Sequence, residues 1–333
     1  MLRCAVLGVG RIGRIHATNL ARGVAGATLV AIADPQPQPL AALARELDEP
    51  RTYLDYRALL AADDVDAVVV CTPTATHYQV LMDVAATGRP IFTEKPIDLD
   101  LANIDRINAE MARRDLPMMV GFQRRYDPDF RRVRDLVRTG AAGDIHIVRI
   151  TSRDAQPPSR EFVPTSGGMF LDMTVHDLDM VRFVTDAEIT GVYAKATVLV
   201  DPMFAELGDW DTAVLTLTLS NGAMATIDNS RRAVYGQDQR LEVFGSKGVV
   251  AATNHGVDRV VSADAAGAHA ARLMDFFPER YKDAYRLEMQ AFVDALVAGQ
   301  PMPVTGADGR QAVVIAMAAH RSAAENRYVA VSQ

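Results

Sequence analysis

The sequence predicts an α/β fold with two domains. The first would be an open parallel sheet covered by helices, and the second an α+β domain with a large open, mostly antiparallel sheet. A length of 333 residues suits two domains better than one. Short apolar runs alternate with amphipathic stretches up to residue 121, which is typical of a parallel sheet. Beyond it, longer alternating runs follow one another directly, which favours antiparallel pairing. We therefore expect domains over 1–121 and 122–333, with the terminal helices free to pack back on the first.

The first domain contains short β-rich runs bounded by turn residues, as buried parallel strands should be. The predicted strands are Cys4–Gly8, Thr28–Ala33, Ala67–Cys71, Ile91–Thr93 and Met118–Gly121, and the predicted helices include His16–Arg22, Leu40–Leu47, His77–Thr87 and Leu101–Arg113. The proline-rich run Pro35–Pro39 predicts a short stiff loop.

The second domain begins with a predicted helix and continues as a series of strands. The helix covers about Pro128–Arg138, and the strands are Ile145–Ser152, Gly191–Leu199, Ala213–Leu219, Met224–Ser230 and Gln239–Phe244. Asn221-Gly222 between two of these strands indicates a tight hairpin. Two terminal helices are predicted over Leu287–Val297 and Gln311–Ala324.

A glycine-rich turn follows the first strand and opens a helix. Gly8, Gly10 and Gly13 allow a tight turn, close approach of a pyrophosphate and close helix–strand packing. Asp34 follows about twenty residues later at the end of the second strand, where a carboxylate binds the ribose hydroxyls of a dinucleotide. The same carboxylate repels a 2′-phosphate, and no arginine follows at once to receive one. The pattern predicts NAD rather than NADP.

A second cluster of chemistry-bearing residues follows two glycines in the second domain. Asp172, His176 and Asp179 recur at i, i+4 and i+7, so a helix would place them on one face. Histidine is the natural base for a secondary hydroxyl, and a carboxylate one turn away can orient it. Lys95, after the strand that ends at Thr93, would add a cation near the developing alkoxide. The pattern is also compatible with a solvated polar stripe, or with a metal site. No clear fourth ligand exists and hydride transfer needs no metal, so we expect none.

Composition excludes several classes of function. The formal charge of −7 disfavours nucleic-acid partners, which require a basic surface. No apolar run is long enough to cross a membrane. Cys4 and Cys71 lie in apolar strand-like runs, as buried free thiols of a reducing compartment do, and the chain opens directly on a strand. A cytoplasmic location is expected.

Together these motifs resemble those of the Gfo/Idh/MocA oxidoreductases along essentially the whole chain. The matching order is Gly8-x-Gly-Arg-Ile-Gly13, Glu94-Lys95-Pro96 and Asp172-x-x-x-His176. Within the family, four segments are similar to inositol 2-dehydrogenases: 123–127, 168–179, 229–236 and 240–248. The resemblance implies a Rossmann domain and a sheet domain used for dimer or tetramer contacts. It also implies an NAD-dependent dehydrogenase that oxidises a myo- or scyllo-inositol type of polyol to an inosose.

The resemblance also implies roles for individual residues. Lys95, Asp172 and His176 would carry catalysis, while Arg125, Asp154 and Tyr235 would bind the substrate. The expected cofactor residues are Gly8, Gly10, Arg11, Ile12, Gly13, Asp34, Thr72, Pro73, His77, Glu94 and Gln123.

One departure from the family pattern concerns the substrate. Gln237 stands where some inositol dehydrogenases carry an aromatic residue, which leaves the stereoisomer open. A dehydrogenase of a related pyranose remains an alternative, as does an NADP-dependent sugar or aldehyde reductase. A non-catalytic NAD-binding sensor would not require Lys95, Asp172 and His176 together. The direction of the reaction and the role of the loop over 201–209 also stay open.

Overall fold

The computed structural model describes residues 1–331, which form two compact units. The first comprises Met1–Tyr126 with Asp283–Gln311, and the second comprises Asp127–Lys282 with the described residues from Ala312 on. The first unit extends to Tyr126, beyond the expected boundary after residue 121. Residues 283–311 also belong to it, and they include one of the terminal helices that were expected to be free to pack back on the first domain.

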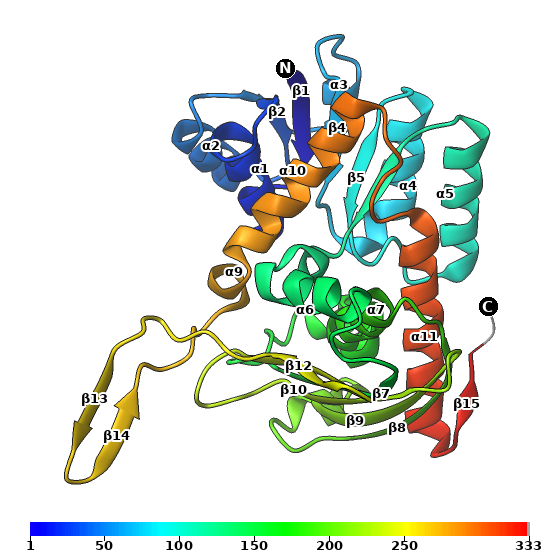
Figure 1. Ribbon diagram of the computed structural model, residues 1–333. Helices are drawn as coiled ribbons and strands as arrows, with labels where there is room; N and C mark the ends of the chain where they lie inside the picture. Colours follow the sequence, from blue (N-terminus) through cyan, green and yellow to red (C-terminus); the bar gives the residue numbers. More distant parts are fainter. Residues whose placement is uncertain (332–333) are drawn as a thin grey trace. The chain divides into compact units, whose positions relative to one another are not determined.

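The sheet of the first unit is entirely parallel. Its strands lie in the order β3-β2-β1-β4-β5-β6, which is the order of a dinucleotide-binding Rossmann sheet (Figure 1). The strands are β1 (Leu2–Leu7), β2 (Ala27–Ala33), β3 (Arg51–Tyr53), β4 (Ala67–Val70), β5 (Ile91–Glu94) and β6 (Met118–Gly121). The predicted parallel sheet is confirmed. The short edge strand β3 was not predicted, because Arg-Thr-Tyr has no apolar run.

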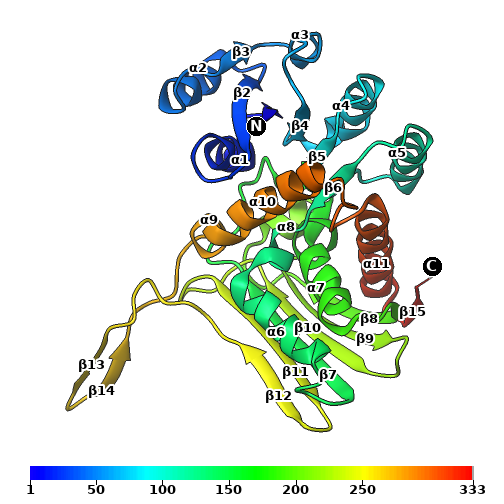
Figure 2. The same ribbon diagram turned by 45° about the horizontal axis from the view of Figure 1, so that its top comes forward.

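Helices cover both faces of this sheet. Figure 2 shows α1 and α10 on one face and α4 and α5 on the other. The helices are α1 (Arg11–Arg22), α2 (Pro37–Glu46), α3 (Tyr56–Leu60), α4 (Thr74–Ala86), α5 (Leu101–Arg113), the 3₁₀ turn η1 (Gln123–Tyr126) and α10 (Lys282–Ala298). The prediction of a loop over Pro35–Pro39 was wrong at its end, since α2 begins at Pro37. Proline suits the first turn of a helix, where its missing N–H costs no hydrogen bond.

The sheet of the second unit is mostly antiparallel, as predicted. Its order is β12-β11-β7-β10-β9-β8-β15, and the β7–β10 pair alone in it is parallel among residues 1–331. The strands are β7 (Ile145–Arg153), β8 (Ile189–Thr197), β9 (Thr212–Leu219), β10 (Met224–Ser230), β11 (Asp238–Gly245), β12 (Gly248–Ala252) and β15 (Val329–Ala330). The predicted hairpin joins β9 to β10, with Gly222 at a φ of 86°.

The two faces of the second sheet differ in what covers them. Residues at alternate positions, such as Ile150, Leu215 and Ile227, are buried on the face that carries α6 (Pro128–Arg138) and α7 (Val175–Thr185) (Figure 1). The opposite face is open. It carries exposed apolar side chains, namely Tyr193, Val214, Met224 and Phe244. A further helix, α11 (Gly306–Glu325), ends before β15.

Several short elements of the second unit were not predicted. They include the 3₁₀ turn η2 (Val163–Thr165), the π-helical turn η3 (Phe170–Thr174), α8 (Met203–Glu206) and α9 (Phe277–Arg280). A separate hairpin, β13 (Val261–Asp264) with β14 (Gly267–Ala270), is exposed along its whole length and projects in Figure 1. Throughout residues 1–331, every helix is too short or too polar to cross a bilayer.

Candidate active site

The glycine-rich turn has the shape that its sequence predicts. Gly8 has a φ of 87°, and a Cβ there would lie 2.6 Å from the carbonyl oxygen of Cys71. A Cβ on Gly13 would lie 1.8 Å from the carbonyl oxygen of Gly8. Both positions therefore require glycine for packing within the chain, because β1, β4 and α1 approach each other without space for a side chain.

Gly10 differs from these two glycines, since a Cβ there would meet nothing within 4 Å. Packing within the chain therefore does not explain its missing side chain. Gly10 is the N-cap of α1, and no side chain caps this helix end. An open, uncapped turn of this kind fits the pyrophosphate of a dinucleotide. Arg11 is exposed and Ile12 is half-buried at the same helix end.

Asp34 lies at the end of β2, as predicted, and also holds the glycine turn. Its Oδ2 accepts a hydrogen bond of 2.9 Å from the backbone N–H of Val9, and its Oδ1 accepts one of 2.9 Å from Gln36. A carboxylate has about four acceptor sites, so both oxygens retain capacity for ribose hydroxyls. Asp34 thus fixes the turn and can bind the ribose next to it.

The ends of β4 and β5 are joined by a buried histidine. One ring nitrogen of His77 lies 2.8 Å from the carbonyl oxygen of Thr72, and the other lies 3.0 Å from that of Pro96. Burial lowers the pKa of His77, so the ring is neutral at pH 7 and donates to one carbonyl at a time. His77 thus holds the segments that follow β4 and β5 together from the buried side. Pro73 is exposed, and the buried hydroxyl of Thr72 has no hydrogen-bond partner within residues 1–331, which also fits a polar ligand.

Glu94 and Lys95 follow from the end of β5. Glu94 accepts a hydrogen bond of 2.7 Å from His16 Nε2, and its side chain is 13% exposed. Lys95 is half-buried and precedes a cis peptide bond to Pro96. His16 was not predicted as a site residue, although its place in the helix after the glycine turn could have indicated it.

Gln123 and Arg125 lie in η1, directly after β6. Gln123 is buried, 4% exposed. The side chain of Arg125 is 10% exposed and donates a hydrogen bond of 3.1 Å to Asp308. Arg125 is therefore not a solvated surface charge, and its guanidinium is oriented by an acid from the end of the chain.

Asp172 and His176 belong to the second unit, whereas Lys95 belongs to the first. Asp172 lies in η3, and His176 lies in the first turn of α7 and is 8% exposed. The prediction of one regular helix face for Asp172, His176 and Asp179 was wrong at its start, because the chain forms a π-helical turn over Phe170–Thr174. A π turn changes the angle between successive side chains, and such turns are frequent at functional sites.

Asp172 pairs with an arginine that the sequence analysis did not select. Arg231 Nη1 donates a hydrogen bond of 2.7 Å to Asp172 Oδ2, and the two side chains are 2% and 19% exposed. Burial alone lowers the pKa of Arg231, but Asp172, Asp154 and Asp209 outweigh it and raise the pKa. Arg231 therefore stays charged beside Asp172. Its partner lies 59 positions away, so no local pattern could have identified it.

A second buried network holds the start of α7 against β10. Thr174 donates a hydrogen bond of 2.6 Å to Asn229 Oδ1, and Asn229 Nδ2 donates one of 2.8 Å to Asp177. Asp209, from the loop over 201–209, accepts one of 3.0 Å from the backbone N–H of Met169. Both contacts fix the segment that carries Asp172 and His176. The loop whose role was open is therefore part of this support.

The two remaining substrate residues lie in different surroundings. Asp154 accepts a hydrogen bond of 2.9 Å from Gln237, so Gln237 orients it. Tyr235 is 48% exposed; its hydroxyl donates to Asp238 over 2.7 Å and accepts from Arg153 over 3.0 Å. Alternation along β7 places Arg153 on the open face of the sheet, opposite to Ile150. Asp154 therefore belongs with Arg231, whose pKa its charge helps to raise. Tyr235 instead contacts residues of the open face of the sheet.

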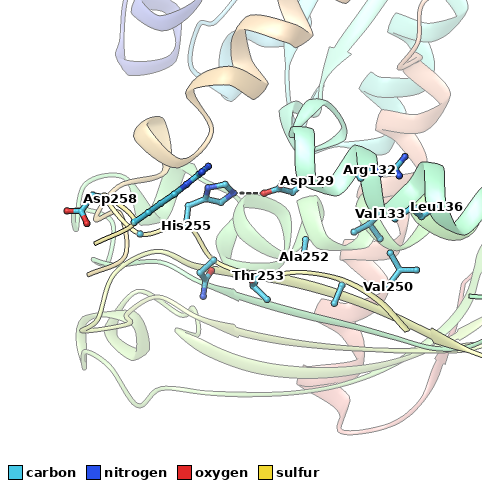
Figure 3. A pocket seen from close by; sticks show the side chains of 13 residues that line it. Asp129, Arg132, Val133, Leu136, Val250, Ala252, Thr253, His255 and Asp258 are labelled. Atoms are coloured by element: carbon cyan, nitrogen blue, oxygen red, sulfur yellow. Dashed lines mark hydrogen bonds and ion pairs between the residues drawn. The ribbon is translucent and has the colours of Figure 1, made fainter. Parts of the chain in front are cut away.

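A pocket of about 400 Å³ lies elsewhere in the second unit, between α6, β12 and the loop that follows β12 (Figure 3). His255 and Asp129 form an ion pair at this pocket. The lining also includes Arg132, Asp258 and Arg259, so acids and bases are mixed. Neither Asp172 nor His176 lines it, and it is not the predicted catalytic centre.

Comparison with known proteins agrees with this architecture. Residues 2–122 match the model described as an oxidoreductase family with an NAD-binding Rossmann fold, and residues 130–251 match the GFO/IDH/MocA C-terminal domain. A myo-inositol 2-dehydrogenase of Thermotoga maritima is 42% identical over 100% of this chain and 99% of its own length. An inositol 2-dehydrogenase of Rhizobium meliloti is 43% identical over 99% of each chain.

A solved structure shows the same similarity in three dimensions. The scyllo-inositol dehydrogenase of Lactobacillus casei with bound NAD(H) and scyllo-inositol has a TM-score of 0.93, with 30% identity and full coverage of both chains. The predicted resemblance is confirmed, and the chain belongs to the Gfo/Idh/MocA family of NAD-binding oxidoreductases.

Proposed function

We propose that this chain is an NAD-dependent dehydrogenase that oxidises one secondary hydroxyl of an inositol to an inosose. The observation that carries the proposal is the 42% identity over 100% of the chain to a myo-inositol 2-dehydrogenase. The glycine turn, Lys95 and the Asp172–His176 segment all fall within that similarity. Myo- and scyllo-inositol are the leading substrates, since relatives named for each cover nearly the whole chain.

In the proposed reaction the substrate loses a proton to one group and a hydride to another. When bound, NAD supplies the hydride acceptor. His176 would accept the proton of the substrate hydroxyl, because an imidazole is half-protonated near neutral pH. The ammonium of Lys95 would stabilise the developing alkoxide, an effect that is strongest where water is excluded. Asp172, paired with Arg231, would stabilise the imidazolium that forms at His176.

The cofactor side of the proposal rests on Gly8, Gly10, Gly13 and Asp34. The open position at Gly10 supports a pyrophosphate on the first turn of α1. The carboxylate of Asp34, held by Val9 and Gln36, supports NAD because it would repel the 2′-phosphate of NADP. Thr72, Pro73, Glu94 and Gln123 would line the same strand ends.

On the substrate side, Arg125 and Asp154 are proposed to bind ring hydroxyls. Each is oriented by a neighbour, Asp308 and Gln237 respectively. Tyr235 lies among residues of the open sheet face, so its contribution would have to come through a face shared with a second copy of the chain.

We further propose that the chain is a cytoplasmic homo-oligomer that associates through the open face of the second sheet. Its two cysteines are free, and four large apolar side chains are exposed on that face. Val214, 55% exposed, lies on β9, next to the central strand β10. Val214→Glu should lower the molar mass measured by light scattering, from a dimer or tetramer to a smaller species. An unchanged mass would place the interface elsewhere.

A panel of substrates and cofactors tests the enzymatic proposal. NADH or NADPH formation would be followed with myo-inositol, scyllo-inositol, other inositols and pyranoses. We expect turnover of an inositol with NAD and far less with NADP. Preference for a pyranose would select the sugar-dehydrogenase alternative, and preference for NADP would select the reductase. No turnover with any pair, with NAD still bound, would favour a sensor.

A further inference from the structure

Three polar side chains meet inside the first unit, beneath the segment that carries Lys95. They are His16 of α1, Glu94 of β5 and Glu288 of α10, and each offers an atom within 4.8 Å of the other two. His16 and Glu288 are completely buried, and the side chain of Glu94 is 13% exposed. A hydrogen bond of 2.7 Å joins His16 to Glu94. The cluster therefore joins the helix after the glycine turn to the strand end before Lys95.

Aromatic rings pack against one member of this cluster. The ring of His16 packs edge-on against Phe92 at 5.0 Å and Tyr285 at 5.7 Å. Neither carboxyl oxygen of Glu288 has a hydrogen-bond partner among residues 1–331. A buried, unsolvated carboxylate is costly, and an apolar side chain of similar volume would avoid this cost. A buried acid whose pKa is strongly shifted, next to residues proposed to bind a cofactor, is a candidate for a functional role rather than a packing role.

Burial and a neighbouring acid both disfavour the ionised form of Glu288. Burial raises the pKa of Glu288 well above its usual range, and the nearby Glu94 raises it further. Cys71, at the end of β4, also faces this region; burial and the two acids raise the pKa of its thiol, so it stays neutral. Ionising Glu288 would place a second negative charge beside Glu94. Repulsion between the two carboxylates would then disturb the bond from His16 to Glu94.

We propose that Glu288 is a positioning residue that acts, as a neutral carboxylic acid, on Glu94 and through it on Lys95. By staying neutral it leaves Glu94 in place as the acceptor of His16, and its head group fills the polar site between α1, β5 and α10. This proposal rests on the proposed dehydrogenase function, because its consequence for turnover is the placement of Lys95. Glu288 itself would not touch substrate.

A divalent metal ion held by the same three residues is the competing interpretation. It requires Glu288 to be ionised, since a metal ligand must be deprotonated. The direct hydrogen bond between His16 and Glu94 instead uses the nitrogen and the oxygen that would face an ion. The neutral acid is therefore the reading that the geometry favours.

Two substitutions separate the effect of the head group from that of folding. Glu288→Gln keeps the shape and is always neutral, so its kcat at pH 7 should stay within about threefold of wild type. Glu288→Leu removes the polar head, and its kcat should fall about 10- to 100-fold with little change in KM for NAD, as for a displaced catalytic group. Gln290→Ala is the matched control, since Gln290 is on the same helix and bonds to Ala25 at the surface. Its kcat should be unchanged.

Two further measurements do not depend on turnover. The infrared carbonyl band of a protonated carboxylic acid should be present in wild type at pH 7 and missing from Glu288→Gln. Because the folded pKa is raised, the stability contributed by Glu288 is present below its unfolded value of about 4.3 and is lost as pH rises towards the folded value. The melting temperature of Glu288→Gln should therefore rise relative to wild type above about pH 4.3.

Distinct results would overturn the proposal. They are a wild-type kcat in Glu288→Leu, an equal loss in Glu288→Gln and Glu288→Leu, or no infrared difference. A stoichiometric divalent ion in the purified protein, found by elemental analysis, would replace the neutral acid by a metal site. If the substrate panel finds no dehydrogenase activity, the proposed function fails by itself. The infrared and melting experiments still decide whether Glu288 is neutral.

Discussion

The glycine turn of the first unit and the Asp172 segment of the second unit are built in opposite ways. The turn is formed by backbone within six consecutive positions, 8–13, and its specificity depends on where side chains are missing. The Asp172 segment depends on charged side chains brought together from distant parts of the chain, as in the Asp172–Arg231 pair. A short sequence motif is therefore enough to predict the glycine turn. The charge pairs of the Asp172 segment form only when the chain is folded, so no short motif predicts them.

The same contrast predicts how each region fails when it is altered. Adding atoms damages the turn, because Gly8 and Gly13 have no space for a Cβ. Removing a charge damages the second region, because Asp172 and Arg231 are paired in a buried site.

Substitution of one proposed catalytic group from each unit should give the largest loss. Lys95→Ala and His176→Ala should each lower kcat by about 10²- to 10⁴-fold, the usual contribution of a proton-transfer group. NAD binding, followed by quenching of protein fluorescence, should persist in both. Wild-type turnover in either variant would show that the substituted residue has no catalytic role.

Arg231→Met should destabilise the second unit strongly. It leaves Asp172 without its arginine, and breaking a buried pair costs about 3–5 kcal/mol of unfolding free energy. Arg138→Met is the control in the same unit, because the Arg138–Asp186 pair is exposed and should contribute at most about 1 kcal/mol. Urea denaturation measures both. Equal losses would show that burial does not distinguish these pairs.

Two glycine substitutions in one turn should have different consequences. Gly13→Ala places a Cβ 1.8 Å from the carbonyl of Gly8 and should lower the melting temperature. Gly10→Ala meets nothing within the chain, so the melting temperature should be nearly unchanged while KM for NAD rises about tenfold or more, which is about 1.4 kcal/mol. A Gly10→Ala variant with an unchanged KM would contradict the pyrophosphate position.

The smallest effect is expected at an ion pair at the amino ends of the central strands β1 and β4. The hydrogen bond from Arg3 lowers the pKa of Asp66 to about 2. Since the folded pKa is depressed, the stability from Asp66 is present above its unfolded value of about 3.9 and is lost as pH falls through about 2. Asp66→Asn should lose less than about 1 kcal/mol at pH 7, because the pair is largely exposed. Urea titrations at pH 7 and near pH 2 should show this difference disappear at the lower pH.

Strands and helices with strong patterns were predicted close to their observed bounds, whereas elements without them were missed. The run Ala67–Cys71 became β4 (Ala67–Val70), because an uninterrupted β-branched run has few alternatives to a buried strand. By contrast, β3, the π turn at Phe170–Thr174 and the hairpin β13–β14 have no apolar periodicity. The return of residues 283–311 to the first unit depends on contacts such as Gln290 with Ala25, separated by 265 positions.

The sequence by itself determined the parallel sheet, the glycine turn with Asp34 and the membership of the family. These properties depend on neighbouring residues, whose periodicity and spacing are readable in one dimension. Only the tertiary structure decided that Arg231 pairs with Asp172, that Asn229 holds the start of α7 and that Glu288 meets Glu94 and His16. Those partners lie far apart along the chain. The distance between their side chains, and so the strength of their interaction, is set only when the backbone is folded.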